Sequence, residues 1–139
     1  MEYVIGVGLG LVVCAFAMLV GFDRDRVFYP MLLSVIATYY ILFAVMGGSI
    51  PALAIESAVA GMFIVLAVVG FKRNLWLTAA ALAGHGVFDL FHRRFIQNPG
   101  IPTWWPGFCL GFDILAGGFM AMLLMRRFGF TVATTTDNR

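Results

Sequence analysis

Charged residues are scarce in this chain. Only 12% of its 139 residues are Asp, Glu, Lys or Arg, whereas soluble domains carry about 25%. Hydrophobic residues make up 62% of the sequence, and the mean hydropathy is +0.96. This composition excludes an ordinary soluble domain and predicts an integral membrane protein whose main partner is the lipid bilayer.

Cysteine is also rare, and no strong excess of charge is present. The two cysteines, Cys14 and Cys109, lie in apolar runs and form no CxxC pair, which argues against a disulfide scaffold or a zinc knuckle. The formal net charge of +2 is small and dispersed, so we expect no nucleic-acid partner. The first apolar run lacks a basic leader and a cleavage site, so we expect a retained helix rather than a signal peptide.

Apolar runs long enough to cross a bilayer occur five times. A spanning helix needs about 20 mostly apolar residues, and charged or Pro/Gly-rich turns separate the five runs. The predicted fold class is all-α: one polytopic transmembrane domain over residues 1–139. The predicted spans are residues 3–21, 27–47, 52–71, 75–95 and 107–125. The intervening segment 96–106 contains three prolines and is predicted to lie outside regular helix.

Basic residues are distributed unevenly between the predicted loops. Five crossings would place Arg93 and Arg94 on one side of the membrane and seven basic residues on the other. Those seven are Arg24, Arg26, Lys72, Arg73, Arg126, Arg127 and Arg139. The positive-inside rule therefore predicts a cytoplasmic C-terminus and an N-terminus outside, in the inner (plasma) membrane.

Five ionisable side chains interrupt the last three predicted spans. His85, Asp89 and His92 stand at i, i+4 and i+7, which places them on one face of a helix. Glu56, Asp89 and Asp113 would each lie about 8–10 Å below the outer end of their helices. A charge inside a span costs about 2.5–3.5 kcal/mol on insertion scales. We therefore expect these groups to face one another, a cavity or an ion rather than lipid.

Two chemistries are open for this cluster. Asp89 with His92, or His85 with Asp89, could chelate a divalent metal, with Asp113 or Glu56 as a third ligand. The favoured ligand set is Asp89, His92 and Asp113, and zinc accepts such mixed sites most readily. Without a metal, a neutral carboxylic acid beside a histidine base could catalyse isomerisation, cyclisation or hydrolysis. The catalytic candidates are then His85, Asp89, Glu56 and Asp113, and a purely structural hydrogen-bonding role is the alternative.

Four residues around the proline-rich segment are candidates for substrate binding. Trp104 and Trp105 could wall the mouth of a pocket, and Arg93 and Arg94 could hold a phosphate or carboxylate. The competing roles are an interfacial aromatic belt for the tryptophans and contacts with lipid phosphates for the arginines.

The leading functional hypothesis is an intramembrane enzyme that acts on a lipid-like or isoprenoid-like small molecule. The alternatives are an ion or proton transporter that uses the same carboxylates, and a structural or assembly subunit. Few polar residues continue into the cytoplasmic half, which argues against a path through the membrane. The sequence leaves a homo-oligomer open.

Two motifs carry a resemblance to known proteins. The first is H-x3-D-x2-H at His85, Asp89 and His92, and the second is P-x-W-W-P-x-F-C-x3-D from Pro102 to Asp113. Together they resemble small, uncharacterised bacterial inner-membrane proteins, which implies a shared five-helix architecture and no particular activity. A looser resemblance is to CREST-type membrane hydrolases, seven-helix enzymes that bind zinc through three histidines and an aspartate. Integral-membrane terpene cyclases, which use intramembrane acidic residues, are a weaker analogy.

Overall fold

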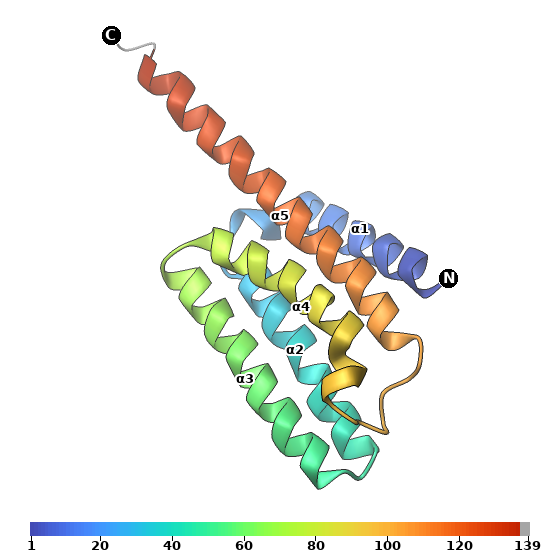
Figure 1. Ribbon diagram of the computed structural model, residues 1–139. Coiled ribbons are helices and arrows are strands. Elements are labelled where there is room, and N and C mark those ends of the chain that lie inside the picture. Colours follow the sequence, from blue (N-terminus) through green and yellow to red (C-terminus); the bar gives the residue numbers. More distant parts are fainter. Residues whose placement is uncertain (137–139) are drawn as a thin grey trace.

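A computed structural model describes residues 1–136, with side chains described through residue 126 (Figure 1). This part of the chain is helical and contains no strand, as the sequence predicts. Its elements are α1 (Glu2–Val20), a 3-10 turn η1 (Phe22–Arg24), α2 (Phe28–Met46), α3 (Ile50–Lys72), α4 (Leu75–Phe95) and α5 (Trp105–Thr136).

The helix boundaries follow local capping chemistry. The Ser49 side chain accepts a hydrogen bond from the Ala52 N–H at 3.3 Å, so α3 begins at Ile50 rather than at residue 52. The prediction that Pro106 lies outside regular helix is wrong, because α5 begins at Trp105 and proline is tolerated in a first turn. Helix α5 also continues past the predicted end at residue 125 to Thr136. Of the basic residues used to predict orientation, Arg139 and the side chain of Arg127 lie outside the described parts.

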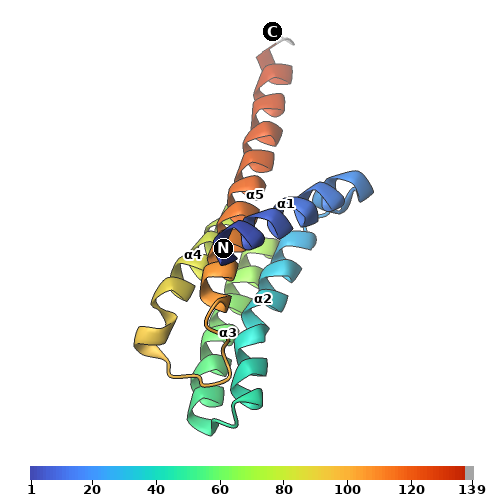
Figure 2. The ribbon, with the colours of Figure 1, turned by 90° about the vertical axis from the view of Figure 1, so that its right-hand side faces the viewer.

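The helices pack side by side in the order α1, α5, α4, α3, α2. Helix α1 is held mainly by α5 and is inclined to the other helices (Figure 2). Its approach to α5 is close because a Cβ atom at Gly6 would collide with the Phe108 carbonyl group. Helices α1 and α2 make little direct contact with each other, so the row of helices does not close into a ring.

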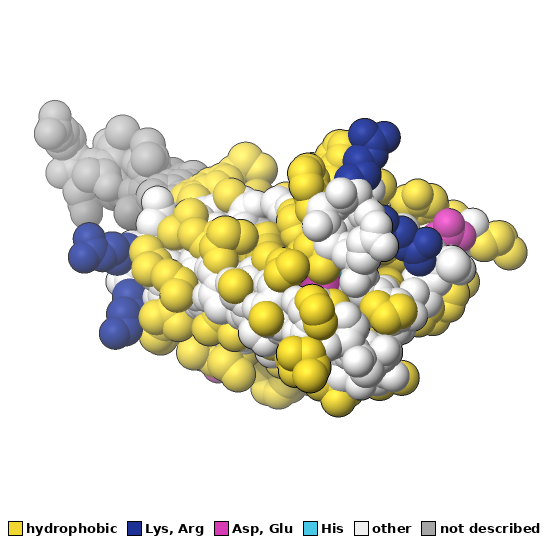
Figure 3. Space-filling model, turned by 60° about the horizontal axis from the view of Figure 1, so that its bottom comes forward, with side chains coloured by type: hydrophobic (Ala, Val, Ile, Leu, Met, Phe, Trp, Pro, Cys, Tyr) yellow, Lys and Arg dark blue, Asp and Glu magenta, His cyan; other side chains and the backbone are white. Residues whose placement is uncertain are grey.

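Four helices are long and apolar enough to cross a membrane. They are Glu2–Val20, Phe28–Met46, Ile50–Lys72 and the Trp105–Arg126 part of α5. Helix α4 is less apolar than these four, so composition supports four of the five predicted spans. The space-filling view shows hydrophobic side chains over most of one face, with Lys and Arg at its two ends (Figure 3). An integral membrane protein is therefore consistent with the structure.

Candidate functional site

Helix α4 places both of its histidines and its aspartate on its buried face. His85, Asp89 and His92 are each at most 2% exposed. The neighbouring glycine, Gly86, allows α5 to approach, because a Cβ atom there would lie 3.0 Å from the Cβ of Asp113. This close approach brings the Asp113 carboxyl group of α5 against His85 of α4.

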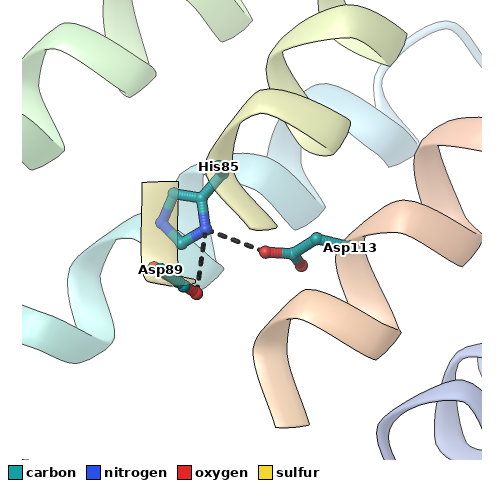
Figure 4. Close-up of side chains that lie close together, drawn as sticks. All are labelled: His85, Asp89 and Asp113. Carbon is teal, nitrogen blue, oxygen red and sulfur yellow. Dashed lines mark hydrogen bonds and ion pairs between the residues drawn. The ribbon is translucent and has the colours of Figure 1, made fainter. Parts of the chain in front are cut away.

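His85, Asp89 and Asp113 form the first polar cluster, which we call the His85 group (Figure 4). Nδ1 of His85 lies 2.8 Å from Oδ2 of Asp113, within hydrogen-bonding distance, and 3.7 Å from Oδ2 of Asp89. One potential ligand atom from each residue lies within 4.8 Å of the other two. The described residues give no hydrogen-bond partner to either oxygen of Asp89 or to Oδ1 of Asp113. The group therefore holds buried acceptors that the protein itself does not satisfy.

Glu56, His92 and Asn98 form a second cluster, the His92 group. Oε1 of Glu56 lies 2.9 Å from Nε2 of His92 and also accepts a hydrogen bond from Nδ2 of Asn98 at 2.9 Å. Asn98 donates in addition to the backbone oxygen of Tyr40 at 3.1 Å. The His92 group thus joins α3, α4, α2 and the α4–α5 connection.

The polar side chains do not form the single site that the depth argument predicts. Glu56 is engaged in the His92 group and Asp113 in the His85 group. The favoured ligand set of Asp89, His92 and Asp113 is not the set that comes together, since His85 takes the position expected for His92. The reason is axial: residues seven positions apart on α4 share a face but lie about 10 Å apart along the helix, so they contact different neighbouring helices.

Tyr40 lies between the two groups, a position that sequence reasoning missed. Its ring stacks on His92, with ring centroids 4.4 Å apart and planes 20° apart, and lies 6.2 Å from the His85 ring. Its hydroxyl group and the Cys109 thiol both lie beside the Asp89 carboxyl group. The Tyr40 hydroxyl is buried and makes no hydrogen bond within normal geometry to the described residues.

A cavity of about 310 Å³ adjoins the His85 group. Helices α1, α2 and α5 line it, mostly with aliphatic and aromatic side chains, and its wall includes Asp113, Cys109 and Trp105. The buried Nε1 of Trp105 has no hydrogen-bond partner among the described residues. The volume of the cavity is near the lower end of the range for small-molecule pockets, about 300–1,000 Å³.

Of the four predicted substrate-binding residues, only Trp105 lines this cavity. Trp104 is 50% exposed and stacks against Trp105 and Phe108 instead. Arg93 and Arg94 are exposed at the end of α4, away from the cavity lining.

In comparisons with known proteins, no family model, curated protein or solved structure matches this chain. The resemblances to bacterial inner-membrane proteins and membrane hydrolases therefore stay predictions, and the site is interpreted from its own chemistry.

Proposed function

We propose that this protein is an integral membrane enzyme that acts on a lipophilic small molecule. The observation that carries the proposal is the apolar cavity whose lining residues include Asp113. Asp113 is also in contact with His85, so the cavity ends at a pair of groups that can exchange a proton. An apolar chamber with one reactive end suits a substrate that is mostly hydrocarbon.

The polar atoms of the cavity define the substrate more closely. Trp105 and Asp113 both line the cavity, and the Trp105 Nε1–H and Oδ1 of Asp113 are buried atoms with no hydrogen-bond partner among the described residues. A few placed polar groups in an apolar pocket fix orientation and provide specificity. The proposed substrate is therefore a lipophilic molecule with one polar end, such as a hydroxyl or carbonyl group.

The route of entry follows from the open row of helices. The cavity lies where α1 and α2 fail to close against each other. The outward side chains of α1 are apolar, as shown by Leu9, Val12 and Phe16, which are 45–64% exposed. In a bilayer this opening would face acyl chains, so the substrate would enter laterally from the membrane.

Five membrane crossings belong to this proposal. The modest hydropathy of α4 comes from polar side chains that face inward, while its exposed side includes Trp76, Val87, Leu90 and Phe91. A helix whose outer face is apolar and whose polar side chains face other helices can cross a bilayer. The basic-residue bias then supports an outside N-terminus and a cytoplasmic C-terminus.

The residues are assigned different roles. His85, Asp89 and Asp113 act on the substrate, as general base and acid or as metal ligands. Glu56, a catalytic candidate from sequence, is assigned to positioning because its two hydrogen-bond partners, His92 and Asn98, belong to the His92 group. A transport path would need polar groups across the other half of the bundle. Towards that half, the buried side chains with a hydroxyl group among the described residues are Thr78 and Tyr29.

Two matched variants of α1 test the proposal. Val13 lines the cavity, whereas the adjacent Val12 is 64% exposed on the outer face. Protein in lipid nanodiscs is incubated with total lipid extract from the host membrane, and products are followed by mass spectrometry. Wild-type protein and Val12→Trp should convert one lipid class, whereas Val13→Trp and Asp113→Asn should not. Full conversion by Val13→Trp, or no conversion by wild type, contradicts the proposal.

A further inference from the structure

We infer that His85, Asp89 and Asp113 form a binding site for one divalent transition-metal ion. The cluster of ligand types alone would not justify this step. The second observation is the Asp89 side chain, which is 1% exposed; the Tyr40 hydroxyl and the Cys109 thiol lie beside it, but neither of its oxygens has a partner within normal hydrogen-bond geometry among the described residues. A buried carboxyl group of this kind is costly unless something absent from the polypeptide satisfies it.

Protonation of Asp89 alone does not remove the free-energy cost of burying its carboxyl group. If Asp89 is ionised, its charge lies in an apolar interior and shares His85 with Asp113. If Asp89 is protonated, its other oxygen still accepts no hydrogen bond of normal geometry from the described residues. Either state leaves Oδ1 of Asp113 unpaired as well. One divalent cation would neutralise two carboxylates and use these vacant lone pairs.

The distances are close to those of a coordination shell. With bonds of about 2.1 Å, neighbouring ligand atoms lie about 3.0 Å apart at right angles and about 3.4 Å apart in a tetrahedron. The observed separations from Nδ1 of His85 are 2.8 Å to Asp113 and 3.7 Å to Asp89. Shifts of a few tenths of an ångström would bring these two separations to those of a metal shell, and the ligand atoms of Asp89 and Asp113 lie within 4.8 Å of each other. A neutral His85 would then carry its proton on Nε2, since an imidazole that binds a metal through Nδ1 is neutral.

The donor set limits the metal. One imidazole nitrogen and two carboxylates suit zinc, manganese, cobalt or ferrous iron, and disfavour the thiolate-seeking cuprous ion. Zinc binds most tightly of these four in the usual affinity order. The surroundings also fit a built site: Phe63 packs edge-on against the His85 ring at 4.7 Å, and the His92 group fixes α4.

The site would have an open side. Three protein ligands leave at least one coordination position on a metal such as zinc. Asp113 lies in the cavity wall, so that position can be reached from the cavity. The polar end of a lipophilic substrate would bind there. This last consequence rests on the proposed function, whereas metal binding itself does not.

The two histidines of α4 provide a matched test. Untagged protein in detergent is stripped with a chelator, titrated with Zn²⁺ and assayed for bound metal by mass spectrometry, with Co²⁺ absorption as a second readout. Wild-type protein should bind one equivalent. His85→Gln and Asp89→Asn should weaken binding by about 100-fold or more, since losing even an outer-shell partner costs about 10–100-fold. His92→Gln should retain binding within that outer-shell range.

Asp89→Asn keeps the inference falsifiable if His85→Gln fails to fold. Zn²⁺ should raise the unfolding temperature of wild-type protein but not that of Asp89→Asn. No bound metal in wild type, equal affinity in Asp89→Asn, or a selective loss in His92→Gln overturns the inference. Metal binding without lipid conversion would refute only the proposed function, and lipid conversion by a wild-type protein that binds no metal in the titration would refute only the metal site.

Discussion

Removal of the Glu56 carboxyl group should uncouple the helices that it joins. Oε1 of Glu56 contacts both His92 and Asn98 at 2.9 Å, and Glu56 is 1% exposed. Hydrogen bonds between helices in a membrane protein average about 0.6 kcal/mol and reach about 1.7 kcal/mol. Glu56→Ala loses two such bonds, so we expect the free energy of unfolding to fall by about 1–3 kcal/mol.

A double-mutant cycle separates this coupling from other effects of truncation. Glu56→Ala, Asn98→Ala and the double variant are unfolded reversibly in mixed micelles, and the coupling energy should be about 0.6–1.7 kcal/mol. Ser34 is the control, because its hydroxyl donates only to the Pro30 carbonyl of its own helix. The pair Glu56→Ala and Ser34→Ala should be additive within about 0.3–0.5 kcal/mol. If the losses in unfolding free energy of the Glu56 and Asn98 variants were additive, the proposed coupling of the helices by Glu56 would be refuted.

Three further outcomes are expected. Tyr40→Phe should keep the stacked ring and most of the stability but lower lipid conversion, measured on the nanodisc assay; unchanged conversion would exclude a role for the hydroxyl. Gly6→Leu should destabilise the bundle in the same unfolding assay, because its Cβ meets α5, whereas Gly8→Leu faces open space and should be nearly neutral; equal effects would contradict the close packing. In a cysteine-free background, Ser49→Cys and Thr103→Cys should react with a membrane-impermeant maleimide from outside; reaction only from the cytoplasmic side would reverse the proposed orientation.

Hydrophobic runs were enough to predict the helices but not all their ends. Helix α4 was predicted at 75–95 and occupies Leu75–Phe95, because Asn74 caps its start by accepting the Trp76 N–H at 3.0 Å. Helix α5 begins at Trp105, two residues before the predicted start at residue 107, because Pro106 does not break the helix. A proline breaks a helix only where its missing N–H and its ring matter, which is not the case in a first turn.

The site was harder to predict because contact depends on helix rotation. Equal depth placed Glu56, Asp89 and Asp113 in one layer, but depth does not specify which neighbour a side chain meets. Tyr40 had no distinguishing signal: it lies next to Tyr39 within an apolar run, and only packing shows which ring points inward. Tyr40 is 3% exposed, whereas Tyr39 is 38% exposed and borders the cavity.

The separation of the two polar groups has a physical consequence for the cavity. If Glu56 joined His85, three carboxylates would share one site, and a single divalent cation would leave a net negative charge in an apolar interior. Engagement of Glu56 by His92 and Asn98 removes that carboxylate from the His85 group. The His85 group then carries two carboxylates, which match one divalent ion in charge. The His92 group thus favours an uncharged His85 group once the proposed metal is bound. An apolar substrate in the cavity could then approach the His85 group without an additional counter-ion.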